Sequence, residues 1–129
     1  MRCSYSRAFD PPAPLVPVRL RAPGRPGVAH ADGKVDTGSD LCAVPERLVA
    51  GLDLPPVRSV RAVGFAGTVQ EATVYRVDLE IDGLVFPRIE ALPTARPYVL
   101  VGRNVLRRLV VRLDGPREKL DIGRPRRRA

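Results

Sequence analysis

The sequence predicts an all-β domain, built as a barrel or a sandwich of short strands. The 129 residues include 14 prolines and 11 glycines, which divide the chain into short pieces and disfavour long helices. The segment Tyr75–Ile81 alternates strictly between apolar and polar residues, as a half-buried strand does. Hydrophobic residues make up 44% of the chain and charged residues 28%, which is ordinary usage for one globular domain.

The first part of the chain predicts two strands and a helix. Residues 1–14 read as an extended, proline-rich lead-in, and a strand is expected over Leu15–Leu20. A second strand is expected over Val28–Val35, where the pair Asp32-Gly33 predicts an interruption or bulge. A short helix is expected over Val44–Gly51, because proline stands near its start and glycine near its end.

The middle of the chain predicts a hairpin. Val57–Val63 and Thr68–Val74 read as strands that flank Gly64-Phe65-Ala66-Gly67, a glycine-rich tip. The pair Asp82-Gly83 predicts a turn after the alternating strand. Further strands are expected over Leu84–Phe86, Ile89–Leu92, Tyr98–Val101, Leu109–Leu113 and Lys119–Ile122, with a helical segment over Arg103–Arg108. The total is eight or nine strands with one or two short helices.

Charge and cysteine usage narrow the class of protein. The net charge is +8, and all but two of the 22 basic residues are arginines. Residues 123–129 form a basic tail, expected to be disordered, which suggests polyanion binding. Nucleic-acid binding is disfavoured because aromatic residues, the usual stacking platforms, are few and scattered. The two cysteines form no metal pair, and neither a signal core nor a membrane span is evident, so a cytoplasmic domain is expected.

One short motif suggests chemistry. Asp36-Thr37-Gly38-Ser39 follows the second predicted strand, and its residues are also common turn formers. Some sixty residues later the run Tyr98–Val101 leads into Gly102-Arg103-Asn104, then apolar residues. The glycine-rich hairpin lies between these two pieces. In this order the three features resemble the retropepsin-like aspartic proteases, both retroviral and single-domain bacterial, over roughly Val16 to Ile122.

The resemblance implies a retropepsin-like acid-protease barrel over residues 15–122 and an aspartic endopeptidase that needs no cofactor or metal. In that family the motif aspartate, here Asp36, belongs to a pair of carboxylates that activates water. Two such carboxylates cannot both be ionised, so one acts as base and the other as acid. These 129 residues contain a single Asp-Thr-Gly. The expected enzyme is therefore a homodimer with one Asp36 from each copy, acting on a peptide or protein substrate.

The resemblance also implies roles for the neighbours of Asp36. Thr37 would bond across the two-fold axis, Gly38 would let the backbone pass close to substrate, and Ser39 would donate to the carboxylate. Asp40 would pair with Arg103, the residue after Gly102, as a buried bidentate brace near the dimer seam. Gly64, Phe65, Ala66 and Gly67 would form the flap over the substrate. Lys34 departs from the family, which has an apolar residue two positions before the aspartate.

Plainer interpretations remain open at this point. The side chains of Thr37 and Ser39 are also compatible with hydrogen bonds that cap the local backbone. The glycine-rich hairpin is also compatible with an ordinary surface hairpin. His30 is interpreted as a strand residue, and Cys42 as a small buried residue without a histidine partner. A dimer that only binds peptides, with weak or absent catalysis, competes with the enzyme.

Overall fold

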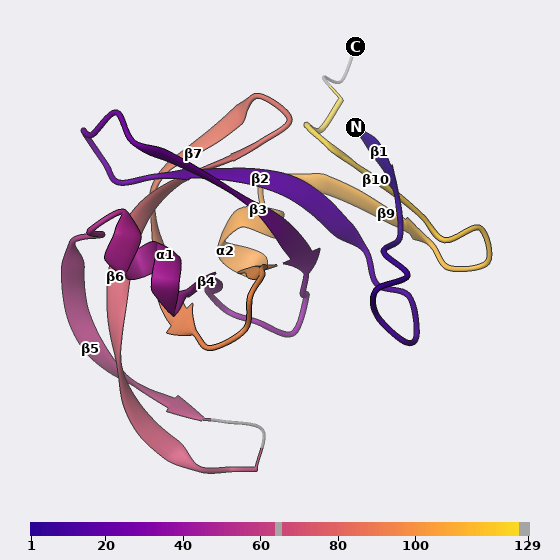
Figure 1. Ribbon diagram of the computed structural model, residues 1–129. Coiled ribbons are helices and arrows are strands. Elements are labelled where there is room, and N and C mark those ends of the chain that lie inside the picture. Colours follow the sequence, from indigo (N-terminus) through magenta and orange to yellow (C-terminus); the bar gives the residue numbers. More distant parts are fainter. Residues whose placement is uncertain (64–65, 127–129) are drawn as a thin grey trace.

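A six-stranded mixed barrel forms the body of the protein (Figure 1). The structure, a computed structural model, describes residues 1–63 and 66–126. The described strands are β1 (Arg2–Ser4), β2 (Leu15–Arg21), β3 (Val28–Val35), β4 (Cys42–Pro45), β5 (Pro56–Val63), β6 (Val69–Ile81), β7 (Leu84–Thr94), β8 (Val99–Val101), β9 (Val110–Asp114) and β10 (Lys119–Gly123). The helices are α1 (Glu46–Gly51) and α2 (Arg103–Leu106). The predicted all-β class and the short helices are confirmed.

The barrel closes because β2 pairs on both of its edges. The strand order is β2-β3-β8-β4-β7-β6, and β2 returns to β6 through a second pairing. Two neighbouring pairs, β3–β8 and β4–β7, are parallel, while the other pairs are antiparallel. The parallel pairing of β3 with β8 sets the carboxyl ends of these two strands side by side. The two segments that follow these strands, Asp36–Ser39 and Gly102–Asn104, therefore meet at one end of the barrel.

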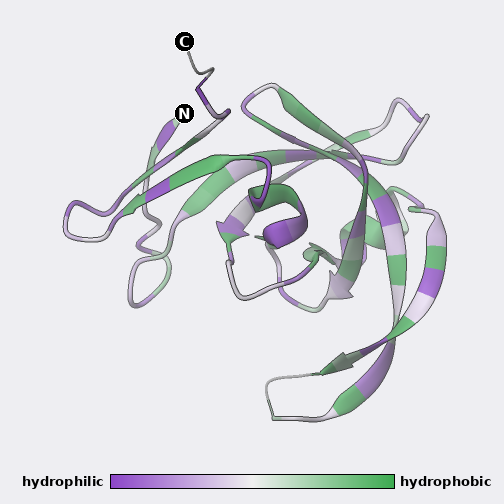
Figure 2. Cartoon of the chain, turned by 180° about the vertical axis from the view of Figure 1, so that it is seen from behind, coloured by the Kyte–Doolittle hydropathy of each residue, from purple (hydrophilic) through white to green (hydrophobic). Residues whose placement is uncertain are grey.

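Alternating apolar residues fill the barrel. On β2, Val16, Val18 and Leu20 are buried and the residues between them are exposed, as the sequence predicted. Figure 2 shows the same alternation of apolar and polar positions along the strands. The core brings these residues together with buried side chains of the other barrel strands and of α2: Val35, Cys42, Val44, Val77, Leu79, Ile81, Phe86, Ile89, Ala91, Val99, Val101, Val105 and Leu106. Burial of this apolar surface is the main force that holds the barrel together.

The predicted interruption of β3 is wrong. β3 pairs with β2 residue for residue from Val28 to Val35, with no bulge at Asp32 or Gly33. Gly33 has a packing role instead. A Cβ at this position would lie 2.7 Å from Val18 Cγ1 and 2.9 Å from Val101 Cγ2, closer than atoms in a core approach one another. The glycine therefore lets the barrel wall close, and β3 runs uninterrupted to Asp36.

Several element bounds also differ from the prediction. Residues 42–45 form strand β4 between β7 and β8, so the helix begins only at Glu46. β6 is a single strand of 13 residues rather than two. β7 is also one strand, although the sequence predicted separate strands over Leu84–Phe86 and Ile89–Leu92. Between these segments the pairing with β6 shifts at a bulge near Arg88, whose φ is 51°. Neither described helix is long and apolar enough to span a membrane.

The β5–β6 hairpin extends away from the barrel as a curved arm (Figure 1). Its strands pair through Val63 and Val69, whose side chains are 71% and 54% exposed near the end of the arm. Of the predicted tip, Gly64 and Phe65 lie outside the described residues, whereas Ala66 lies in a turn and Gly67 adopts a φ of +75°. The arm therefore presents two exposed valines near the end of its described strands.

The two ends of the described chain pair with each other. β10 lies between β1 and β9 in a three-stranded antiparallel sheet. β1 falls within the predicted lead-in, and β10 ends at Gly123, one residue into the predicted tail. Residues 124–126 have no regular structure, and residues 127–129 lie outside the described part of the chain.

Candidate active site

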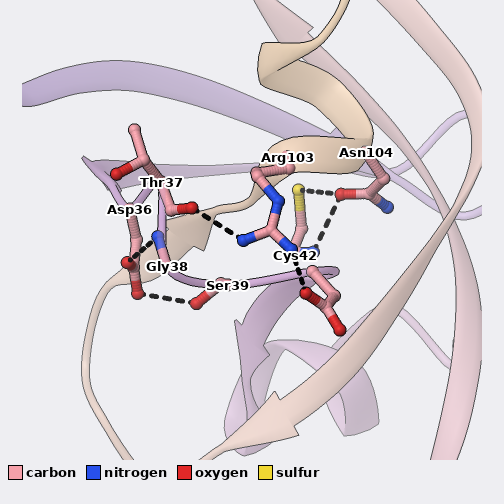
Figure 3. Close-up of polar contacts among 8 residues, drawn as sticks. Asp36, Thr37, Gly38, Ser39, Cys42, Arg103 and Asn104 are labelled. Carbon is pink, nitrogen blue, oxygen red and sulfur yellow. Dashed lines mark hydrogen bonds and ion pairs between the residues drawn. The ribbon is translucent and has the colours of Figure 1, made fainter.

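Asp36 stands at the carboxyl end of β3, in the loop that leads to β4. Its backbone N–H donates to the carbonyl of Val101 on β8 at 3.0 Å, which continues the parallel pairing past the strand end. One carboxylate oxygen accepts from the Gly38 backbone N–H at 3.0 Å, and the other accepts from the Ser39 hydroxyl at 2.6 Å (Figure 3). Both oxygens are thus held by the loop itself, while the side chain remains half-exposed.

Helix α2 packs against this loop and holds it in place. The backbone N–H groups of Arg103 and Asn104 donate to the carbonyls of Ser39 and Asp40 at 2.8 and 3.2 Å. These donors belong to the first turn of a helix and have no partner within it, so the loop satisfies them. The Arg103 guanidinium also donates to the Thr37 carbonyl at 2.8 Å. Three loop carbonyls are therefore tied to one helix end.

The expected pair of Asp40 with Arg103 is present but differs in kind. Arg103 Nη2 contacts Asp40 Oδ1, while its Nη1 donates to Thr37 instead of the second carboxylate oxygen. The Asp40 side chain is 83% exposed and that of Arg103 is 53% exposed in the single chain. The predicted buried, bidentate brace is therefore wrong for the protomer, because the guanidinium divides its donors between two partners near the surface.

Asn104 connects the same helix to β4, a role that the sequence did not single out. Its side-chain oxygen accepts from the Cys42 backbone N–H at 3.0 Å and from the Cys42 thiol at 3.2 Å. Its side-chain nitrogen donates to the Glu90 carbonyl on β7 at 2.8 Å. A signal was available, since Asn104 follows Gly102-Arg103 directly. The Asn104 side chain therefore links β4 to β7 next to the site loop.

Cys42 is buried, as predicted, and its thiol faces α2. Burial raises the pKa of the thiol to about 11, so it remains protonated at neutral pH and can donate to Asn104. The sulfur also accepts from the Gly102 N–H at 3.3 Å. A protonated thiol used in this way is structural, because the nucleophilic form of cysteine is the thiolate.

Gly102 allows α2 to approach the loop this closely. A Cβ at Gly102 would lie 2.4 Å from the carbonyl oxygen of Leu41, and that oxygen belongs to the backbone. Gly38 is less constrained, since the atom nearest to a Cβ there would be an Asp36 carboxylate oxygen at 3.3 Å. The glycine of the second motif is therefore required for packing.

The structure brings the predicted residues together unevenly. Asp36, Thr37, Gly38, Ser39, Asp40 and Arg103 form one connected site (Figure 3), and Gly102 packs against the same loop at Leu41. The Thr37 side chain is exposed and makes no side-chain hydrogen bond within the described residues. His30 lies on β3, and no group of three or more potential metal ligands occurs in the part of the chain that the structure describes. Of the carboxylates in this site, that of Asp36 has both oxygens held by donors of the loop.

Arg103→Ala is expected to lower the stability of the fold by about 1–2 kcal/mol, because it removes a bond to a backbone carbonyl and an exposed ion pair. Asp40→Ala removes only the ion pair and is expected to cost less than about 1 kcal/mol. Chemical unfolding of both variants beside Arg107→Ala, a neighbouring exposed arginine, tests this order. Equal losses for the Arg103 and Asp40 variants would show that the Thr37 contact contributes nothing.

The fold is shared with solved proteases of the retropepsin type. A retropepsin-like aspartic protease from Rickettsia conorii superposes with a TM-score of 0.61 at 17% identity, over 93% of this chain and 86% of that one. The EIAV protease, solved with an inhibitor, gives a TM-score of 0.57 at 18% identity, over 81% of this chain and 92% of that one. A foamy viral protease-reverse transcriptase superposes with a TM-score of 0.55 at 15% identity, over 72% of this chain. The matched part is only 12% of that longer protein.

These similarities concern the fold. No family model matches the sequence, and no curated protein does. At identities below 20%, the similarity shows the fold alone, the mixed barrel with its two short helices. The protein therefore has the retropepsin fold, with Asp36 at the carboxyl end of β3 in the loop held by α2.

Proposed function

We propose that the protein is an aspartic endopeptidase that works as a homodimer, with one Asp36 from each copy in a shared site. The observation that carries the proposal is the geometry of Asp36. Its two oxygens are each held by one loop donor, at 3.0 and 2.6 Å, at the end of a rigid barrel strand. A carboxylate that is oriented in this way and half-exposed suits a group that exchanges protons with water.

Peptide hydrolysis needs more than one such group. One carboxylate removes a proton from water as the oxygen attacks the carbonyl carbon, and a second, protonated carboxyl supplies a proton toward the amide. The tetrahedral intermediate then collapses, the C–N bond breaks, and the amine leaves with a proton. The described residues contain one Asp-Thr-Gly loop, so the second carboxyl is assigned to another copy.

The surroundings of Asp36 fit this assembly. Thr37 and Gly38 are exposed in the single chain, on the loop that would face the two-fold axis. The β5–β6 arm would lie over a substrate held in extended form, donating backbone bonds and excluding water. Its exposed Val63 and Val69 would then be covered by the substrate or by the other copy.

The expected kinetic result is a loss of specific activity on dilution. Cleavage per chain should fall toward zero below the dimer dissociation constant, with an initial rate that scales with the square of the protein concentration. A fluorogenic peptide, measured beside sedimentation at the same concentrations, tests this. A peptide that carries a hydroxyl in place of the scissile carbonyl is expected to inhibit and to shift the sedimentation toward the dimer. Constant activity per chain in a range that sedimentation shows to be monomeric would exclude the shared site.

A further inference from the structure

A basic residue shares the outward face of β3 with Asp36. Side chains of a strand alternate between its two faces, and Val35, between Lys34 and Asp36, points into the core with 8% exposure. Lys34 and Asp36 therefore project to the same side, and both are half-exposed. Two residue steps along a strand separate their Cα atoms by about 7 Å. A glutamate side chain is long enough to span this distance from a residue next to the scissile bond.

The neighbouring strand extends this face. Lys34 pairs with Leu100 on the parallel strand β8, and the buried Val99 and Val101 flank Leu100. By the same alternation, Tyr98 lies on the outward face together with Leu100. The outward face near Asp36 thus carries Lys34 and the half-buried Leu100, with Tyr98 further along, level with Asp32.

Two aromatic rings, Phe9 and Tyr98, lie near the Lys34 ammonium, and Arg96 contacts Tyr98; we call Phe9, Lys34, Arg96 and Tyr98 the Lys34 cluster. Lys34 Nζ lies 5.0 Å from the centre of the Phe9 ring and 5.8 Å from that of Tyr98. The two rings meet edge to face at 5.2 Å. Arg96 lies over the Tyr98 ring and donates to its hydroxyl at 2.7 Å. The rings thus fix the position of the ammonium, by contacts that stabilise cations.

Asp32 and Asp36 lie two positions to either side of Lys34 on the same face of the chain, but neither carboxylate forms an ion pair with it. Among the described residues, neither Lys34 nor Arg96 forms an ion pair, whereas Arg7, Arg19, Arg25, Arg58, Arg76, Arg103 and Arg117 do. An apolar side chain bound at this place would cover the Lys34 ammonium and leave it without a partner, which is costly. A carboxylate would instead accept a charge-assisted hydrogen bond.

From this arrangement we infer that the Lys34 cluster binds an acidic side chain of the substrate, at a residue next to the scissile bond. The inference rests on the proposed function and names its substrate class: peptides with aspartate or glutamate beside the cleaved bond. In a two-fold dimer each copy supplies one Lys34. The preference then applies on either side of the bond, and it distinguishes glutamate from its uncharged isostere glutamine.

A pool of peptides of equal length with randomised central residues tests the inference, with the products identified by mass spectrometry. Glutamate beside the cut is expected to be enriched about tenfold over glutamine, which is the effect of one charge-assisted hydrogen bond. Lys34→Met is expected to abolish the enrichment, Lys34→Arg to retain it, and Lys34→Glu to replace it by a preference for lysine and arginine. Lys119→Met, the only other lysine changed in the same way, is the control.

A binding measurement separates this inference from the proposed activity. The same pool is passed over immobilised Asp36→Asn protein, with and without Lys34→Met or Lys119→Met, and the retained peptides are sequenced. A net charge of +8 retains acidic peptides by itself, so the difference between the two lysine variants decides. Acidic enrichment that depends on Lys34 without cleavage by the parent chain would uphold recognition and reject hydrolysis. Cleavage that shows no acidic preference, or one that Lys34→Met leaves intact, would overturn the inference.

Discussion

Asp36→Asn is expected to lower kcat/KM for peptide cleavage at least about a thousandfold, while the protein still folds and dimerises. Asparagine has nearly the same shape as aspartate, but its amide cannot take a proton from water. The hydrogen bonds of the loop can persist. The Gly38 N–H can donate to the amide oxygen, and the Ser39 hydroxyl, now 2.6 Å from Asp36 Oδ2, can rotate to accept from the amide nitrogen.

The control for this variant is Asp53→Asn. Asp53 is an exposed carboxylate after α1 with a φ of 50°, a conformation that asparagine tolerates well. Thermal melting, sedimentation and cleavage are measured on both variants and on the parent. Normal cleavage by Asp36→Asn would reject the aspartic mechanism whatever the fold. Unfolding of Asp36→Asn, with Asp53→Asn intact, would mark Asp36 as a structural turn residue.

Gly102→Ala is expected to give the largest loss of stability, above about 3 kcal/mol, because the new Cβ would meet the backbone of Leu41 and not a movable side chain. For a chain of this size such a loss lowers Tm by about 10 °C or more. Relaxation would have to separate α2 from the loop, so the bonds from Arg103 and Asn104 to the loop carbonyls would lengthen. Cleavage should therefore fall even at temperatures where the variant is folded.

Gly115→Ala serves as the matched control for this substitution. Gly115 lies in the turn between β9 and β10, and nothing lies within 4 Å of a Cβ placed there. Chemical unfolding should give a change within about 0.5 kcal/mol for this variant. If the two alanine variants unfold alike, the close approach of α2 to residue 41 is not what holds the loop.

Local patterns predicted the elements whose residues alternate. β2 and the second half of β6 have buried residues at every second position, and the pair Asp82-Gly83 forms the turn after β6 with φ values of 48° and 75°. β4 shows no such pattern, since all four of its residues are buried, and its last residue, Pro45, is typical of a helix start. β1 has only three residues and depends on pairing with β10. Such non-local pairing leaves no periodic signal.

The candidate site likewise combines features that short motifs predict with features that depend on packing between distant segments. The residues from Asp36 to Ser39 and the pair of Asp40 with Arg103 could be anticipated from short motifs, and their hydrogen bonds lie within the loop or between the two motifs. The exposure of Asp40 and the bonds of Asn104 to Cys42 and Glu90 depend on how three strands meet. A sequence pattern reports neither, because both are properties of packing between distant segments.

The pairing of β1 with β10 has a consequence for the order of folding. The amino group of Met1 donates to the carbonyl of Ile122, 121 positions away, at 2.9 Å, and among the described strands β1 pairs only with β10. A contact between residues so far apart requires nearly the whole chain to be gathered first, and the entropy of closing that loop is lost before the contact forms. Hairpins such as β6–β7 close over a two-residue turn and can form early. The addition of β1 to the β9–β10 hairpin is thus expected to be a late step, after the segments between β1 and β10 have been brought together.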